Sequence, residues 1–180
     1  DRDLYIAYLT EAYHHVRHTC PLLAHALAHC PKQDRVYREA LLEYLDEEKG
    51  HEEWILNDIA ACGGDADQVR HERPGAAAEL MVAYAYHTID RGNPVGFLGM
   101  VLVLEGTSVR VATEAAQKLQ TSLGLPKQAF SYLTSHGSLD VSHMDFYRNL
   151  VNRLESTEDQ EAVIHCAKRF YRLYGDVFRE

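Results

Sequence analysis

The chain of 180 residues has the length of one domain, and its 46% hydrophobic content suffices for a buried core. Its net charge of −9, from 27 acidic and 18 basic residues without a basic run, excludes nucleic acid as an expected partner. The four cysteines show no C-x-x-C spacing, which indicates reduced, buried thiols rather than a disulfide framework.

The sequence shows no apolar run of about 18 residues and no basic-then-apolar leader. We therefore expect a soluble, cytoplasmic protein that does not bind a membrane. The chain opens at Asp1 rather than at methionine, which is typical of either a trimmed protein or a piece of a longer polypeptide.

Apolar residues recur at three- and four-residue spacing along nearly the whole chain, and no stretch alternates as a strand would. This pattern predicts an all-α fold, a single-domain bundle of about seven helices over residues 1–180. Proline, glycine and asparagine clusters mark the breaks between helices. We expect helices at 4–29, 34–61, 75–90, 95–123, 126–136, 139–154 and 157–178, with a polar loop up to Pro74 and Ser138 as the N-cap of the helix at 139–154.

The helix at 34–61 contains Glu48 and His51, three residues apart. Helical bundles use this spacing to direct a carboxylate and an imidazole at one metal ion. Glu47, four residues before His51, is placed almost as well and stays an alternative to Glu48. A solvated acidic helix face is the competing interpretation of the same residues.

The helix at 95–123 opens with an apolar run and places Glu105 directly after it. A buried carboxylate needs a partner, either a metal ion or an arginine such as Arg17 or Arg110. The helix face that carries Glu105 is largely apolar and suits an aliphatic or amphipathic substrate. One of the two arginines would then pair with a carboxylate of that substrate. The residues predicted to share this face are Val101, Leu102, Ser108, Val109 and Ala112.

His136, Asp140 and His143 stand at offsets that return to one stripe of a helix. Imidazole and carboxylate together suit first-row transition metals such as iron and zinc. A polar cap region is the alternative interpretation of this segment.

A second Glu-x-x-His pair, Glu11 and His14, lies in the first helix. A ferritin-like carboxylate bundle would use two such pairs, but that arrangement leaves the segment 136–143 without a role. His14, His15 and His18 stay open as pocket-lining residues. We expect no ligand role for the remaining histidines of the chain, which are His25, His29, His71, His87 and His165.

Taken in order, Glu48-x2-His51, then Glu105 within Leu-Glu-Gly-Thr-Ser, then His136-x3-Asp140-x2-His143 resemble the ligand set of the haem-oxygenase-like di-iron oxidases. These proteins share a fold with the thiaminase-like TenA and the PqqC-type proteins and bind no haem. The resemblance covers most of the chain. It implies a haem-oxygenase-like fold and six iron ligands, namely Glu48, His51, Glu105, His136, Asp140 and His143.

One position departs from many members of this family, which place the first glutamate seven residues before its histidine. Here that position is Tyr44. The three-residue spacing of Glu48 and His51 resembles the branch of the family that decarboxylates fatty acids.

The resemblance also implies the chemistry: two Fe(II)/Fe(III) ions activate O2 and oxidise a small organic substrate that is fatty-acid-like or amino-acid-like. Tyr132, one turn before His136, is expected to face the same site as a catalytic residue, although a core tyrosine would have the same spacing. Bundles of this kind often pair through exposed helix faces, so a homodimer is one expected assembly.

Three alternatives share the fold. A thiaminase-like hydrolase needs a cysteine nucleophile beside a carboxylate, and no cysteine is near Glu105 or 136–143 in the sequence. A non-catalytic binding protein would leave the six ligand-type residues without a purpose. A haem oxygenase would need a proximal histidine from the first helix, with His14, His15 or His18 as candidates.

Overall fold

The structure is a computed structural model that describes residues 1–31 and 34–180, including all of their side chains except those of 137–142. The described residues form helices and no strand, which confirms the all-α class. The elements in chain order are α1 (Arg2–Val16), α2 (Thr19–His29), α3 (Arg35–Glu47), α4 (His51–Ala61), α5 (Ala66–His71), α6 (Ala76–Arg91), the 3-10 helix η1 (Pro94–Phe97), α7 (Leu98–Leu123), the 3-10 helix η2 (Lys127–Phe130), α8 (Ser131–Val151) and α9 (Thr157–Val177).

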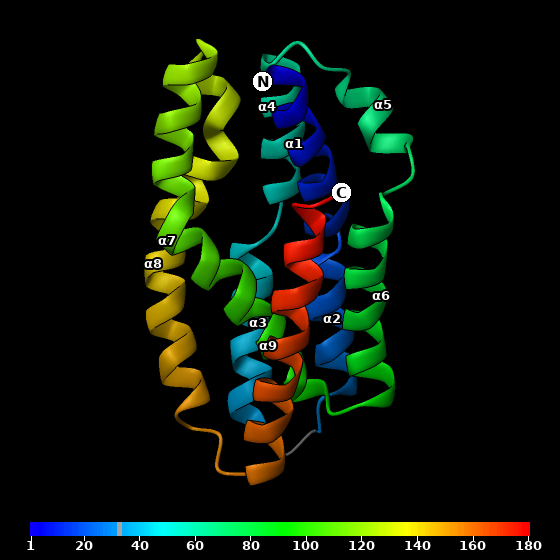
Figure 1. Cartoon of the computed structure of the whole chain (residues 1–180). Coiled ribbons are helices and arrows are strands. Elements are labelled where there is room, and N and C mark those ends of the chain that lie inside the picture. Colours follow the sequence, from blue (N-terminus) through cyan, green and yellow to red (C-terminus); the bar gives the residue numbers. More distant parts are fainter. Residues whose placement is uncertain (32–33) are drawn as a thin grey trace.

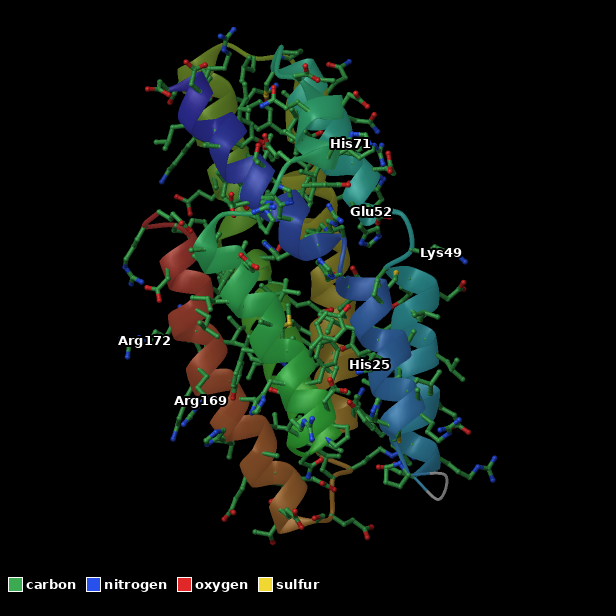
Figure 2. All side chains as sticks on the ribbon, turned by 90° about the vertical axis from the view of Figure 1, so that its right-hand side faces the viewer. His25, Lys49, Glu52, His71, Arg169 and Arg172 are labelled. Atoms are coloured by element: carbon green, nitrogen blue, oxygen red, sulfur yellow. The ribbon has the colours of Figure 1, made fainter. Side chains whose placement is uncertain are left out.

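The helices pack side by side as an elongated bundle (Figure 1). α1 pairs with α4 in the upper half of that view, and α2 pairs with α3 in the lower half. α7 packs along α8 and against α9, which also contacts α6. The charged side chains of Lys49, Arg169 and Arg172 point away from the bundle (Figure 2).

Two predicted long helices are each divided into two. The helix expected at 4–29 breaks at Arg17 and His18, because Pro21 lacks the N–H that an unbroken helix would direct at the carbonyl of Arg17. The helix expected at 34–61 breaks before His51, because Gly50 adopts a left-handed conformation with φ of 88°. These breaks were not predicted from the periodicity, which continues across both.

Two further predictions are corrected, one for the polar loop before Pro74 and one for the helices expected at 126–136 and 139–154. The loop expected before Pro74 contains the short helix α5, which Asp65 caps by accepting the backbone N–H of Gln68 at 2.9 Å. The helices expected at 126–136 and 139–154 are one helix, α8, preceded by η2. Ser138 is therefore inside a helix rather than at its start.

The buried apolar side chains form two clusters, one above the other along the bundle. The upper cluster contains Tyr5, Leu9, Tyr13, Ile55, Ile59, Ala112, Phe130, Tyr132 and Leu133, among others. The lower cluster contains Leu22, Tyr37, Tyr44, Met81, Phe97, Val103, Tyr147 and Phe170, among others. The polar residues Glu48, His51, Glu105 and His143 are also buried. Along each chain segment that carries them, they lie between residues of the lower cluster and residues of the upper cluster. The fold thus holds a polar layer at the level where the clusters meet.

In the described residues, the stretch Pro94–Leu123 is long and apolar enough by composition to cross a membrane. However, 56% of its most apolar window is buried inside the protein. Because α7 packs against α8 and α9, core packing accounts for this apolar character.

Candidate metal centre

Glu48 and His51 flank the break between α3 and α4 rather than sharing one helix. Glu48 is the C-cap of α3, Gly50 provides the left-handed turn, and His51 is the first residue of α4. The two side chains nevertheless meet, since Nδ1 of His51 lies 3.0 Å from Oε2 of Glu48. Both residues are buried, with exposed fractions of 4% for His51 and 7% for Glu48.

The start of α8 is fixed by Asp58 of α4, a fully buried carboxylate. The backbone N–H groups of Ser131 and Tyr132 donate to it at 3.0 and 2.9 Å, and the Ser131 hydroxyl donates as well. The N-cap residue of α8, Phe130, provides no side-chain cap of its own. Asp58 therefore takes the part of the N-cap from a neighbouring helix and sets the position from which His136 and His143 extend.

His143 of α8 lies between the carboxylates of the other two ligand-bearing segments. Its Nδ1 is 3.3 Å from Oε1 of Glu105 on α7 and 3.7 Å from Oε1 of Glu48. On the other side of the ring, Nε2 is 3.1 Å from Oε2 of Glu47. The nearby Glu105 carboxylate raises the pKa of His143 to about 9, although burial acts in the opposite direction.

The pKa of Glu48 depends on the histidines that surround its carboxylate. Burial would raise this pKa, but the hydrogen bond from His51 and the nearness of His136 and His143 outweigh burial, so the pKa is lowered overall. The carboxylate is therefore ionised at neutral pH, as a metal ligand must be.

Two groups of ligand atoms converge, and they share one residue. Ligand atoms of Glu48, His51 and His136 lie within 4.8 Å of one another, and so do those of Glu48, Glu105 and His143. A carboxylate common to two groups is the arrangement that a bridged dinuclear site requires. Buried carboxylates mixed with imidazoles form a donor set that fits iron.

Glu47 and Glu48 differ in exposure and in whether they belong to the ligand groups. The Glu47 side chain is 46% exposed and the Glu48 side chain 8%. Among the described residues, Glu48 belongs to both ligand groups and Glu47 to neither. Asp140 lies in the helical backbone of α8 between His136 and His143, but its side chain is outside the described residues, so its ligand role stays a prediction.

The competing pair in the first helix has another role. Both carboxylate oxygens of Glu11 accept the backbone N–H of Gly75 at 3.1 Å. In the described part of the chain, Glu11 and His14 join no group of converging ligand atoms.

A separate ligand-type group lies outside this centre, between α2 and α6. Nε2 of His25 is 2.6 Å from Oδ1 of Asp90, and Nε2 of His29 is 3.6 Å from the same oxygen. We expected no ligand role for either histidine. The contact with Asp90 joins residues distant in the sequence, so no sequence spacing indicated this group.

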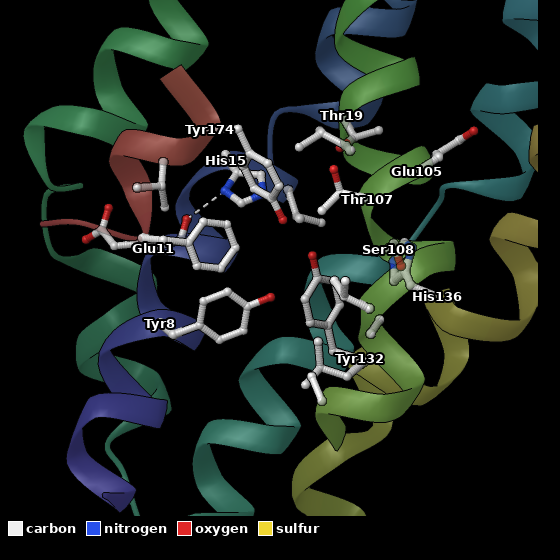
Figure 3. Close-up of a pocket in the computed structure, with 18 of the residues that line it drawn as sticks. Tyr8, Glu11, His15, Thr19, Glu105, Thr107, Ser108, Tyr132, His136 and Tyr174 are labelled. Atoms are coloured by element: carbon white, nitrogen blue, oxygen red, sulfur yellow. Dashed lines mark hydrogen bonds between the residues drawn. The ribbon is translucent and has the colours of Figure 1, made fainter. Parts of the chain in front are cut away.

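A cavity of about 490 Å³ adjoins the ligand cluster. Glu48, Glu105 and His136 belong to its lining, which is otherwise largely apolar and comes mainly from α1, α2, α7, α8 and α9. Figure 3 shows Tyr132 and Ser108 on the side of His136, with His15, Thr19 and Tyr174 on other walls.

The pocket prediction is partly confirmed. Of the residues expected to share the face of Glu105, Val101, Ser108 and Ala112 line the cavity, whereas Leu102 and Val109 are not part of the described lining. Arg17 and Arg110 do not line it either. Arg17 lies over the ring of Tyr13 and Arg110 is exposed, so the expected arginine partner for a substrate carboxylate is wrong.

Two tyrosines of the lining flank the ligand cluster. The rings of Tyr132 and His136 have centroids 4.9 Å apart in an edge-on arrangement. The ring of Tyr44 approaches His143 edge-on at 6.1 Å, and its hydroxyl is buried without a hydrogen-bond partner in the described residues. The sequence analysis singled out position 44, because many members of the resembled family have a glutamate there. It did not predict that the hydroxyl of Tyr44 would be unpaired.

Residues 6–175 match the family of iron-containing redox enzymes, and the chain belongs to this family. The chain is 25% identical over 162 residues to a 4-aminobenzoate synthase of Chlamydia pneumoniae, covering 88% of this chain and 71% of that protein.

Two solved structures have the same fold. A domain of unknown function with a haem-oxygenase-like fold from Shewanella denitrificans superposes with a TM-score of 0.91 at 26% identity, over 99% of this chain and 77% of that one. A TenA homologue from Pseudomonas syringae pv. tomato superposes with a TM-score of 0.79 at 13% identity, over 99% of this chain and 78% of that one. The family and the haem-oxygenase-like fold inferred from the sequence are confirmed.

Proposed function

We propose that the protein is a non-haem di-iron oxidase or oxygenase that uses O2 to oxidise a small organic substrate. The observation that carries this proposal is the pair of ligand groups that share Glu48 beside an apolar cavity. Membership of the iron-containing redox enzymes supports iron as the metal. Ferrous iron in such a site supplies electrons for the reduction of dioxygen.

The residues proposed to hold two irons are Glu48, His51, Glu105, His136, Asp140 and His143. His51 and His136 would complete one site and Glu105 and His143 the other, with Glu48 common to both. The apolar lining would exclude water and bind the hydrocarbon part of a fatty-acid-like or amino-acid-like substrate. Tyr132, buried beside His136, would donate a hydrogen bond or a proton to a substrate in the cavity.

A thiaminase-like hydrolase on the same fold is the alternative. The likeness to a TenA homologue supports the shared fold. A hydrolase of that class needs a cysteine nucleophile, but Cys20, Cys30, Cys62 and Cys166 are not among the residues that line the cavity. This observation favours the oxidase.

The test is anaerobic loading of the protein with ferrous iron, followed by a metal count and by exposure to oxygen. We expect about two irons per chain and a change in the absorption spectrum on oxygen exposure, as a carboxylate-rich dinuclear site predicts. Binding of no iron, or a spectrum indifferent to oxygen, would contradict the proposal.

Matched variants sharpen this test. Glu48→Ala should abolish binding of both irons, because its carboxylate is common to the two ligand groups. Glu47→Ala removes the adjacent, half-exposed carboxylate and should leave both irons bound. Equal losses in the two variants would show that the bridging assignment is wrong.

A further inference from the structure

His15 of α1 is a buried histidine that the ligand groups do not use. It is 2% exposed and forms part of the cavity lining. Its Nδ1 lies 2.9 Å from the backbone carbonyl oxygen of Glu11. Because a carbonyl only accepts hydrogen bonds, Nδ1 must carry a hydrogen. Burial also lowers the pKa of His15 to about 4, so the ring is neutral at physiological pH.

The other ring nitrogen of His15 is therefore an acceptor. A neutral imidazole with hydrogen on Nδ1 has a lone pair on Nε2, and this atom makes no hydrogen bond to the described residues. Because His15 lines the cavity, a molecule bound there can donate a hydrogen bond to this acceptor. His15 thus presents an unused acceptor to the cavity.

The surroundings of His15 include other uncharged polar groups. Thr19 and Thr107 belong to the same lining, and the ring of Tyr174 meets His15 edge-on with centroids 5.9 Å apart. Figure 3 shows His15 across the cavity from His136, so this polar wall lies apart from the ligand cluster.

We propose that His15 is the specificity-determining residue of the cavity, and that its Nε2 accepts a hydrogen bond from an O–H or N–H group of the substrate. The substrate class is then an amphipathic molecule with a hydrogen-bond donor, such as an alcohol or an amine, at a distance from the carbon that is oxidised. The described charged side chains along the cavity, Asp1, Glu11, Glu48, Glu105 and Glu180, are all acidic and disfavour an anionic group at this position. The inference rests on the proposed function only in taking this cavity as the substrate site.

The experiment compares two probes of equal composition in the metal-free protein. 1-Octanol and 1-methoxyheptane are isomers, and only octanol carries a hydrogen-bond donor. The measured quantity is the ratio of their affinities by isothermal titration calorimetry. We expect His15→Phe to lower the octanol-to-ether ratio about fivefold, the size of effect that one neutral hydrogen bond produces.

Two further variants separate recognition from packing. His15→Gln retains an acceptor and should recover part of the octanol preference. His14→Phe makes the same change one residue earlier, at a position equally buried but outside the cavity lining, and should leave the ratio unchanged. Circular dichroism checks that each variant folds.

A measurement on the unaltered protein keeps the test independent of variant folding. The 15N resonance of His15 Nε2 should shift on addition of octanol and not on addition of the ether, because only octanol donates to the lone pair. Failure of octanol to bind, an unchanged ratio in His15→Phe, or an Nε2 resonance indifferent to octanol would overturn the proposal. Since no iron is present, these outcomes are separate from the iron-binding test of the proposed function.

Discussion

Replacement of Asp58 should destabilise the protein more than replacement of an ordinary helix cap. Asp58→Ala removes the acceptor of two backbone N–H groups at the start of α8 and of the Ser131 hydroxyl. Each buried donor left without a partner costs about 1–3 kcal/mol. Two unpaired N–H groups alone therefore predict a loss of about 4 kcal/mol.

The pKa of Asp58 limits how large this loss can be. Burial raises the pKa of Asp58, and the hydrogen bonds from Ser131 and Tyr132 offset this only in part. Keeping the carboxylate charged in the core thus has a cost that the alanine variant no longer bears. Asp58→Asn removes the charge but retains one acceptor oxygen, so its loss should be smaller, about 1–2 kcal/mol.

Urea unfolding of the metal-free variants, followed by circular dichroism, measures these losses as changes in the free energy of unfolding. The matched control is Asp65→Ala, which removes the exposed N-cap of α5 and should cost about 1 kcal/mol or less. Iron binding provides a second readout, since a loosened α8 displaces His136 and His143. A loss for Asp58→Ala no larger than for Asp65→Ala would refute the role of Asp58 in positioning α8.

Three further perturbations have outcomes that follow from single contacts. Acid should destabilise the protein through His15, because its pKa is about 4 in the folded state and 6.5 in the unfolded state. As the pH falls from 6.5 to 4, the unfolded state takes up a proton that the folded state does not. The free energy of unfolding should therefore decrease over this range, by about 3 kcal/mol in full. Urea unfolding across that range should give a flatter profile for His15→Phe, and an equally steep profile would count against the buried neutral ring. Tyr44→Phe should leave the free energy of unfolding of the metal-free protein unchanged or raise it by up to about 1 kcal/mol, because the hydroxyl has no partner there; a marked loss would reveal a hidden one. Gly50→Ala should cost about 1–2 kcal/mol and weaken iron binding, because φ of 88° strains alanine at the turn between Glu48 and His51; retention of full stability would contradict the left-handed turn.

The sequence was a good guide where the site depends on positions along a helix. Glu105 follows an apolar run, and its burial and contact with His143 match the expectation that it needs a partner. His136 and His143 both lie on α8, as their offsets on one helical stripe predict, although the expected helix bounds put a break between 136 and 139. Gly137 and Ser138 resemble a break only locally, because the cap that starts α8 comes from Asp58, far away in the sequence.

The choice between Glu47 and Glu48 shows a limit of helical phase. Neighbouring residues on a helix point about 100° apart, and both can be close to a residue three or four positions later. The structure ends α3 at this point, and the turn at Gly50 then sets the direction of His51. A left-handed glycine inside a periodic pattern gives no apolar signal, so sequence reasoning could not predict the break.

The contacts among the ligand residues explain how two carboxylates can be buried between two apolar clusters. Glu48 and Glu105 would repel one another and would lack solvation in that layer. His143 lies between them, and its raised pKa of about 9 means that it carries a compensating positive charge in the metal-free protein at neutral pH. His51 adds a hydrogen bond to Glu48 on the other side. These contacts between opposite charges offset part of the cost of burying the two carboxylates in the metal-free protein.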